Sequence, residues 1–402
     1  MSDKDLIVPP PIPFSDVTIG ELEEASKFLG ATTAELVENT LRGANSEKKN
    51  PVNVYDRYYT PTGDILVRFS KLNDAAYTAS VADTITKLNK AFDDLEQAVL
   101  TEDYKNLTKT GKPGGTAYLN AIKKMRYWLQ DPIGRKPPYT IFAKGNIKLP
   151  FWAFSTLPGV TCPGAGDCLV DPEDKSKRGW CYSFSQWRHV SPFFRQLQNT
   201  LLIRFKDKSW IEAEAKKKFK PGQVVRLYVD GDMDSKDTIG YWMHFCERYP
   251  QNQFYGYSKS WGLFKGWHTD HNGNWPSNYV MNLSSGTKLE RILSKEDFQA
   301  KVKEMLSLKN PKTGHRIARG TFRALKVKSK SPGRSRTGKV LPAWNAHYKE
   351  VMEAAKTAGI KGDFSSKGIF ICPGYCGDCL PNGKHACGDK RFEDMAIVIG
   401  IH

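Results

Sequence analysis

Short strand candidates alternate with helix candidates from about residue 138 onward, and few architectures accommodate such an order. The runs VVRLYVDGD, QFYGYSKS and YVMNLSSG have the length and the aromatic or β-branched content of strands. Helix candidates cover about 190–205 and 235–249, and another at about 345–357 precedes the short run GIFI. Strand–helix–strand order is typical of parallel β/α proteins. We therefore predict an α/β fold with a TIM-like or partial β/α barrel core.

The first third of the chain has a different pattern. Helix candidates cover about 18–30, 33–41 and 75–100, where apolar residues recur every three or four positions. We predict a mostly helical accessory domain over residues 1–137 and a cysteine-rich β/α core over residues 138–402. The core carries a basic insertion at about 310–342.

Charge is distributed unevenly along the chain. The net charge is +17 at pH 7, and almost all of it lies beyond residue 150. Such a distribution favours a polyanionic partner, with nucleic acid as the first candidate. A basic protein that lysine keeps soluble is the alternative interpretation.

No run of 18 or more apolar residues occurs, and the first residues do not combine a basic stretch with an apolar core. We therefore expect neither a membrane span nor a secretory signal. The expected location is cytoplasmic, where thiols remain reduced.

Seven of the eight cysteines fall into two clusters separated by about 190 residues. Thiolates select zinc, copper(I) or iron–sulfur clusters, and the glycines and prolines between the cysteines allow their sulfurs to converge. We predict that these seven cysteines bind metal, and that Cys246, inside a helix candidate, is a core residue. The predicted ligands are Cys162, Cys168, Cys181, Cys372, Cys376, Cys379 and Cys387.

An iron–sulfur cluster, of the 4Fe–4S type, is the expected cofactor, and zinc is the alternative. Only Cys376 and Cys379 have the Cys-x2-Cys spacing of a zinc knuckle. Cys372-x3-Cys376-x2-Cys379 instead has the spacing of a three-cysteine set that leaves one iron open, as in radical-SAM enzymes. Asp378 precedes the last cysteine where those enzymes have an aromatic residue, so a radical-SAM-like enzyme is kept as an alternative function.

Polar residues follow the strand candidates at the ends where parallel β/α proteins place their chemistry. Asp230 and Asp232 could hold Mg²⁺ or a polar substrate, and Lys259 could contact a phosphate or a carboxylate. We predict these three residues as catalytic. The alternatives are a helix N-terminus rich in aspartate, which includes Asp234, and a lysine that merely extends from the rim of the barrel.

Two groups of residues are predicted to bind nucleic acid. The tryptophans Trp261 and Trp267, together with Trp275, stand among Gly, Asn and His in apparent loops and could stack on unpaired bases. The stretch 323–339 has no acidic residue and reads as a mobile basic loop, with a solvated run of charge as the alternative. Its cations are Arg323, Lys326, Lys328, Lys330, Arg334, Arg336 and Lys339.

The motifs TCPGAGDC with a later CY, RLYVDGD, FYGYSKS, NLSSG and a final ICP resemble the phage gene product 88 family. The resemblance covers roughly residues 150–290 and 366–390, and the charged stretch LVDPEDKSKRGW is a departure that separates Cys168 from Cys181. It implies a phage origin, a metal-linked core and a location in the cytoplasm of an infected host cell. The positions that match the family's motifs are Cys162, Cys168, Cys181, Asp232, Tyr257, Lys259, Ser284, Cys372 and Cys379.

The leading hypothesis is therefore a phage-encoded iron–sulfur protein that acts on or with nucleic acid. A radical-SAM-like enzyme and a zinc-stapled structural or host-interaction protein are the alternatives. The sequence leaves open whether the protein is an enzyme, which reaction it catalyses, and its oligomeric state.

Overall fold

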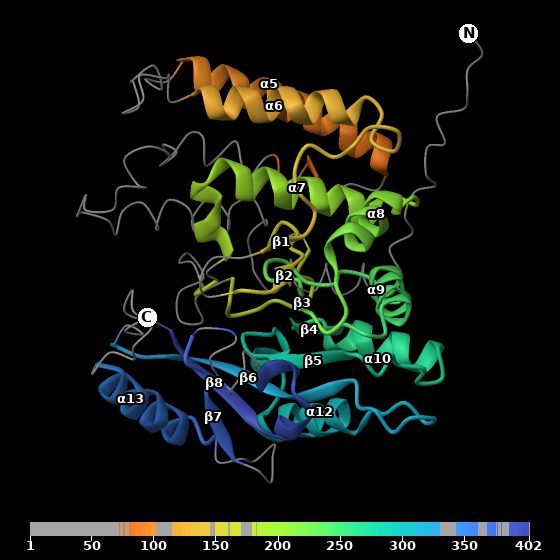
Figure 1. Cartoon of the computed structure of the whole chain (residues 1–402). Helices are drawn as coiled ribbons and strands as arrows, with labels where there is room; N and C mark the ends of the chain where they lie inside the picture. Colours follow the sequence, from red (N-terminus) through yellow and green to blue (C-terminus); the bar gives the residue numbers. More distant parts are fainter. Residues whose placement is uncertain are drawn as a thin grey trace. The chain divides into compact units, whose positions relative to one another are not determined.

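The computed structural model describes residues 72, 75–76, 80–101, 115–144, 149–159, 161–169, 179–181, 183–329, 343–360, 368–374, 376, 379 and 386–401 (Figure 1). The chain divides into two compact units, and each is described by itself. Unit 1 comprises Met1–Phe142, Ser155–Pro163 and Leu169–Lys218; unit 2 comprises Ala143–Phe154, Gly164–Cys168 and Phe219–His402. The helices expected over 18–30 and 33–41 lie outside the described residues, and the domain boundary at residue 137 remains a prediction.

Unit 1 is helical in its described part. It contains α5 (Val81–Thr101), α6 (Thr116–Leu129), the 3₁₀ helix η1 (Ser183–Arg188), α7 (Val190–Arg204) and α8 (Ser209–Lys218). The helices predicted at 75–100 and 190–205 are confirmed by α5 and α7. The residues that α5 buries are the apolar ones that recur every three or four positions. One of them, Phe92, stacks on Phe194 of α7, with ring centroids 6.3 Å apart.

Polar side chains of α7 fix the chain segments around it. Asn199 donates hydrogen bonds to the carbonyls of Ile141 and Ser155, both at 3.0 Å. The Gln198 amide donates to the Tyr139 carbonyl at 2.9 Å. These bonds satisfy backbone groups of irregular segments that would otherwise be buried without partners.

Unit 2 is built on one eight-stranded sheet in the order β1-β2-β3-β4-β5-β6-β8-β7. β1 and β2 are antiparallel, and every other neighbouring pair is parallel. The strands are β1 (Ala143–Lys144), β2 (Trp152–Ala153), β3 (Val224–Leu227), β4 (Gln253–Ser258), β5 (Tyr279–Ser284), β6 (Ala318–Lys326), β7 (Ile369–Ile371) and β8 (Ala396–Ile401).

The predicted α/β class with a mostly parallel sheet is thus confirmed, but a closed TIM-like barrel is not. β2 to β6 follow one another in chain order, as in a barrel. β8 then enters between β6 and β7, which leaves β7 at an edge, and among the described residues no pairing joins β7 to β1. The sheet is therefore open.

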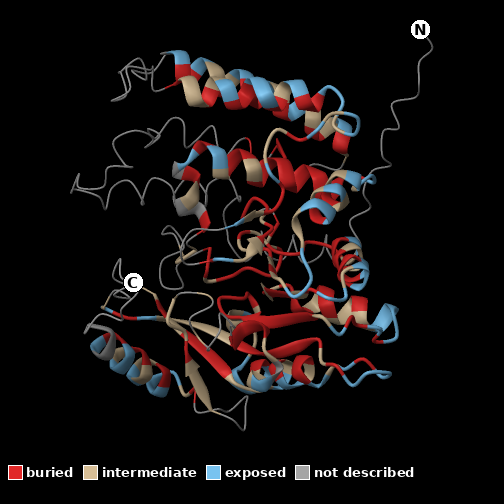
Figure 2. Ribbon diagram, in the orientation of Figure 1, coloured by how far each residue is buried: buried red, intermediate tan, exposed pale blue. Residues whose placement is uncertain are grey.

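Helices of unit 2 pack on the sheet, and burial is deepest in its central strands (Figure 2). The helices are α9 (Lys236–Arg248), α10 (Trp261–Asp270), α11 (Leu289–Ile292), α12 (Lys295–Ser307) and α13 (Ala343–Thr357). All six residues of β5 are buried. Such continuous burial is expected of a parallel strand that is covered on both faces.

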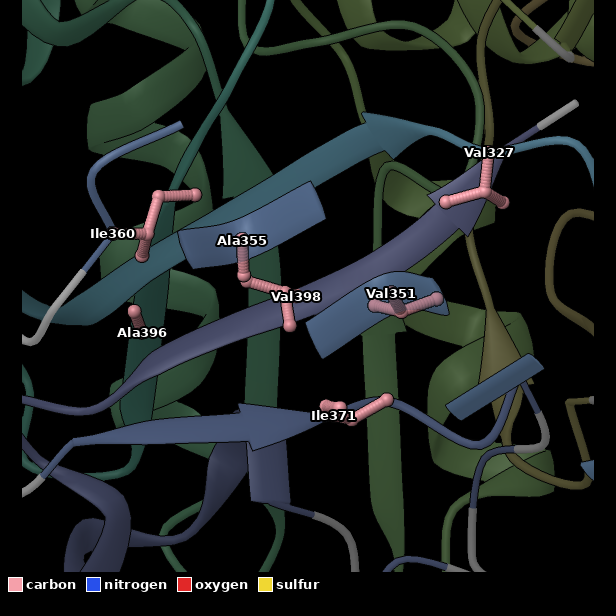
Figure 3. Packing of buried hydrophobic residues seen from close by; sticks show 7 residues of the cluster. All are labelled: Val327, Val351, Ala355, Ile360, Ile371, Ala396 and Val398. Carbon is pink, nitrogen blue, oxygen red and sulfur yellow. The ribbon is translucent and has the colours of Figure 1, made fainter. Parts of the chain in front are cut away.

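The packing of α13 shows which face of β8 this helix covers. Val351 and Ala355 of α13 belong to one apolar cluster with Val398 of β8 and Ile371 of β7 (Figure 3). Ile397, the neighbour of Val398, belongs to a different cluster that contains Cys387. Because side chains alternate between the two faces of a strand, α13 and the Cys387 cluster cover opposite faces of the sheet.

The expectation that Trp261, Trp267 and Trp275 are exposed stacking surfaces is wrong, although Trp275 does lie in a loop. Trp261 and Trp267 belong to α10, and the three side chains are 1%, 2% and 1% exposed. Trp261 stacks on Phe298 at 5.6 Å, and Trp267 packs edge-on against Trp275 at 5.4 Å. Large aromatic side chains gain more by such burial than by exposure, so the tertiary packing overrides the glycine-rich local sequence.

Candidate metal centre and the carboxyl end of the sheet

Four cysteines gather on the face of the sheet opposite α13; we call Cys372, Cys376, Cys379 and Cys387 the C-terminal cysteine cluster. Cys372 directly follows β7, and Cys387 lies in the 3₁₀ helix η3 (Ala386–Gly388). Cys372 and Cys379 pack against the apolar cluster that contains Cys387, Tyr255 and Ile397. The Tyr255 hydroxyl donates to Cys376 Sγ at 3.9 Å. All four thiols therefore meet one group of side chains over β4 and β8.

The thiols influence one another electrostatically. Burial raises the pKa of Cys387 to about 12, a rise that Arg319 and a hydrogen bond with Tyr257 partly oppose. Burial also holds the pKa of Cys372 well above its usual range, and the neighbouring Cys387, Cys379 and Cys376 raise it further. Several thiolates cannot form here together unless a cation compensates their charge, and a bound metal supplies that charge.

A buried cation stands beside the cluster because of an irregularity in β6. The register passes from Met281 opposite Ala318 to Asn282 opposite Gly320, so Arg319 is an extra residue in its strand. A bulge of this kind redirects a side chain. Arg319 is 1% exposed, and its Nε donates to Asn282 Oδ1 at 2.8 Å.

Asn282 joins this arrangement to the cysteine segment. Its side-chain nitrogen donates to the Cys387 carbonyl at 2.9 Å and to the Gly256 carbonyl at 3.1 Å. With Arg319 as donor to its oxygen, the buried amide has both of its ends satisfied. Asn282 thus fixes η3 and Arg319 relative to each other.

The chemistry of this donor set fits a thiolate-bound metal, since four sulfurs and a compensating guanidinium share one buried region. The sulfurs do not form a coordination shell in this structure. Among the residues that the structure describes, no group of three or more His, Cys, Asp or Glu side chains is positioned to hold a metal ion. All eight cysteines are described, and none forms a disulfide bond.

The three cysteines of the other predicted cluster are divided between the two units. Cys162 and Cys181 belong to unit 1 and are partly buried; Cys168 belongs to unit 2 and is buried. The Cys168 amide donates to the Gly286 carbonyl at 3.5 Å, just beyond the carboxyl end of β5. Their role as ligands remains a prediction. Cys246 is fully buried in α9, which confirms its prediction as a core residue.

A second polar constellation lies where β3, β4 and β5 end, as the sequence predicts. Asp232 is 5% exposed, and its Oδ2 accepts hydrogen bonds from the Lys259 amide at 2.8 Å, Ser258 Oγ at 3.1 Å and Ser260 Oγ at 3.2 Å. Its Oδ1 accepts from the Met233 amide at 2.8 Å. Burial raises the pKa of Asp232, and the bond from the Lys259 amide and the Lys259 charge oppose that rise. Oδ2 therefore fixes the segment that leads into α10, and Oδ1 fixes the backbone next to Asp232 itself.

The side chain of Lys259 extends from the end of β4 to the end of the neighbouring strand β5. Its Nζ donates to Ser284 Oγ at 3.1 Å. Of the two other aspartates, Asp230 is buried, and Asp234 accepts from Thr238 Oγ1 at 2.9 Å within the first turn of α9. Asp234 thus lies at the N-terminus of α9, next to the N-cap residue Ser235, as the alternative interpretation of this residue has it.

The first residues of the predicted basic loop belong to the sheet. β6 continues to Lys326, and Arg323 forms an ion pair with Glu290 and lies over the Phe298 ring at 5.8 Å. Arg323 is therefore a residue of the sheet and not of a mobile loop. Lys326 and Lys328 are exposed. The remaining predicted cations, Lys330, Arg334, Arg336 and Lys339, lie outside the described residues.

Sequence reasoning did not single out Tyr255, Asn282 or Arg319 as site residues, and it named Ser284 only as a position that matches the family's motifs. An available signal was the alternation in QFYGYSKS, which places Tyr255, Tyr257 and Lys259 on one face of a strand. The bulge that redirects Arg319 leaves no comparable trace in the sequence.

Fold and site together define an α/β protein with an open, mostly parallel sheet and a cluster of four cysteines on one face. The chain belongs to the phage gene product 88 family, because the family's sequence profile, described as Gene product 88, matches residues 124–357. The matched range includes Asp232, Lys259 and Ser284 and ends before Cys372. No curated protein and no solved structure matches the chain.

No helix in the described part of the chain combines the length and apolar character that a membrane crossing requires.

Proposed function

We propose that this protein binds a metal through the C-terminal cysteine cluster and that the bound group is an iron–sulfur cluster. The observation that carries the proposal is the packing of the partly buried Cys372 and Cys379 against the apolar cluster that contains the buried Cys387. The Tyr255 hydroxyl of that cluster donates a hydrogen bond to Cys376. Thiols separated by up to 15 residues in sequence converge there on one face of a sheet. Metal binding would draw their sulfurs together and release their protons.

The presence of a fourth thiol bears on the alternatives. A radical-SAM-like enzyme needs three ligands and one open iron, whereas Cys387 adds a fourth sulfur in the cluster against which Cys372 packs. Four ligands favour a fully coordinated centre, which suits electron transfer or a structural role. Zinc would use the same four ligands, so the choice between zinc and iron is decided by experiment.

Action on or with nucleic acid forms the second part of the proposal. Its support is the net charge of +17 and the position of exposed Lys326 and Lys328 at the carboxyl end of β6. Lys259 follows β4 at the same carboxyl end of this parallel sheet. A cytoplasmic location in the infected host cell belongs to the proposal as well, since thiols remain reduced there.

Anaerobic purification of the full chain, followed by iron, acid-labile sulfide and zinc analysis, tests the metal proposal. We expect iron and sulfide in equal amounts and an absorbance band at about 400 nm, which iron–sulfur clusters give. Cys372→Ala and Cys387→Ala should lose the metal, and Cys246→Ala, a matched core cysteine, should retain it. Zinc without iron and sulfide would show that the bound group is zinc and not an iron–sulfur cluster. A metal-free wild type would overturn the proposal.

A further inference from the structure

We infer that Lys259 and Ser284 form a binding site for the phosphate group of a ligand, at the carboxyl end of β4 and β5. The inference goes beyond the metal proposal and does not depend on it. It starts from the bond between Lys259 Nζ and Ser284 Oγ, 3.1 Å long, which joins the ends of two neighbouring parallel strands. In open α/β sheets, ligands bind at this end of the strands.

The lysine acts as a charged donor and not as a base. The carboxylate of Asp232 interacts favourably with the Lys259 charge, which stabilises the ammonium form of the lysine. An ammonium group with three N–H donors recognises an anion as a point charge. α10 begins two residues after Lys259, and the positive end of its backbone dipole adds to the same field.

The oxygens of Asp232 are already engaged by donors of the protein itself. Asp232 accepts hydrogen bonds from Ser258, Lys259, Ser260 and Met233, all of them at 3.2 Å or less. The aspartate is therefore a positioning residue that holds the backbone of Lys259. This geometry favours an anion at Lys259 over a magnesium ion at Asp232.

Ser284 has a hydroxyl that can turn to a ligand. Ser284 Oγ accepts from Lys259, and its bond to the Ser285 carbonyl is long, at 3.5 Å. A phosphate oxygen offers a stronger acceptor for this hydroxyl than that carbonyl does. One phosphate could thus accept from Lys259 Nζ and from Ser284 Oγ together.

The register places this pair on the same face as the C-terminal cysteine cluster. Tyr257 lies opposite Asn282, and each of them contacts Cys387. Lys259 and Ser284 stand two residues further along the same two strands, about 7 Å away at the rise of a strand. A ligand anchored by its phosphate at this edge would lie next to the cysteine cluster.

Calorimetric titration of the full chain with inorganic phosphate tests the site. Lys259→Met should weaken phosphate binding at least tenfold, Ser284→Ala should weaken it severalfold, and Lys259→Arg, which keeps the charge, should retain most of it. The matched control is Lys265→Met, because Lys265 lies on α10 and pairs with Glu304. Absence of phosphate binding in the wild type, or equal affinity in Lys259→Met, would overturn the inference.

A measurement on the wild type covers the case in which a variant fails to fold. Reductive methylation followed by peptide mass spectrometry reports the reactivity of each lysine, and metal content is measured on the same samples. Phosphate should slow methylation of Lys259 and leave Lys265 unchanged. Equal slowing at both lysines, or none at Lys259, contradicts a phosphate site at this edge.

Discussion

The side-chain amide of Asn282 donates to the carbonyl of Cys387 at 2.9 Å and so joins β5 to a segment 105 residues away. The same side chain accepts from Arg319 and donates to Gly256. One buried amide thus orients both the cysteine segment and the cation beside it.

Replacement of this amide should destabilise the fold. We expect Asn282→Ala to lower the free energy of unfolding by about 3 kcal/mol, because it removes the acceptor of the buried Arg319 Nε and the donor to the Cys387 carbonyl. Urea denaturation followed by tryptophan fluorescence measures the loss. Asn274→Ala, at an exposed asparagine, should change stability by no more than about 0.5 kcal/mol. Equal effects in the two variants would show that the buried network contributes nothing.

The stability of the fold should require the carboxylate group of Asp232. Its Oδ2 accepts three donors, whereas the amide of Asp232→Asn can present only one accepting oxygen and places an N–H₂ group against other donors. We expect a loss of about 2–4 kcal/mol. Asp270→Asn is the control, since Asp270 forms an exposed ion pair with Lys236 and should cost less than about 1 kcal/mol. A tolerated Asp232→Asn would refute the positioning role.

The contribution of Glu350 should depend on pH. Hydrogen bonds from Ser329 and from the Lys328 amide lower the pKa of Glu350 below its ordinary value of 4.5. A carboxyl group whose pKa is lower in the folded state stabilises that state above the unfolded pKa, and the gain is lost as pH falls through the folded pKa. Glu350→Gln should therefore have a lower urea midpoint than the wild type at pH 7, and the two midpoints should converge as pH falls below the folded pKa of Glu350. A difference that persists in acid would contradict this account.

The exposed lysines at the end of β6 should contribute to the salt dependence of nucleic-acid binding. Each phosphate contact adds about 0.9 to the log–log slope on duplex DNA, so the double variant Lys326→Ser, Lys328→Ser should flatten the slope by about 1–2. These substitutions leave β6 intact, whereas deletion of 323–339 would remove its last residues, including Arg323. Binding curves with one oligonucleotide at several salt concentrations measure the slopes. Unchanged slopes would show that these lysines are merely solvated.

The strands with regular hydrophobic patterns could be predicted from the sequence, and so could the polar residues that follow them. β3, β4 and β5 are confirmed within the predicted runs, and Asp232 and Lys259 lie at their carboxyl ends. This agreement arises because both the strand pattern and the strand-end position are local properties of the sequence.

β6 and α10 show where local reasoning fails. β6 carries Arg319, Arg323 and Lys326 and so reads as a basic loop, but the two arginines find partners in Asn282 and Glu290, which only the fold brings near. α10 contains Gly262 and Gly266, and its helical state depends on the burial of Trp261 and Trp267. Long-range contacts of this kind override propensity.

The cysteine segment could be predicted from the sequence only in part. Its spacing predicts convergence of Cys372, Cys376, Cys379 and Cys387, and the structure groups them on one face. Neither Tyr255 beside Cys376 nor Arg319 beside Cys387 could be found from the segment, because β4 and β6 supply them.

X-ray absorption at the edge of the bound metal tests the central claim most directly, because it counts the atoms around that metal. Anaerobically purified protein should show a first shell of sulfur alone, at the distance of about 2.3 Å typical of metal–thiolate bonds, with a second iron neighbour if a cluster is bound. Cys246→Ala should give the same spectrum. A first shell of nitrogen or oxygen, or a shell unchanged in Cys372→Ala and Cys387→Ala, would contradict a metal centre in the C-terminal cysteine cluster.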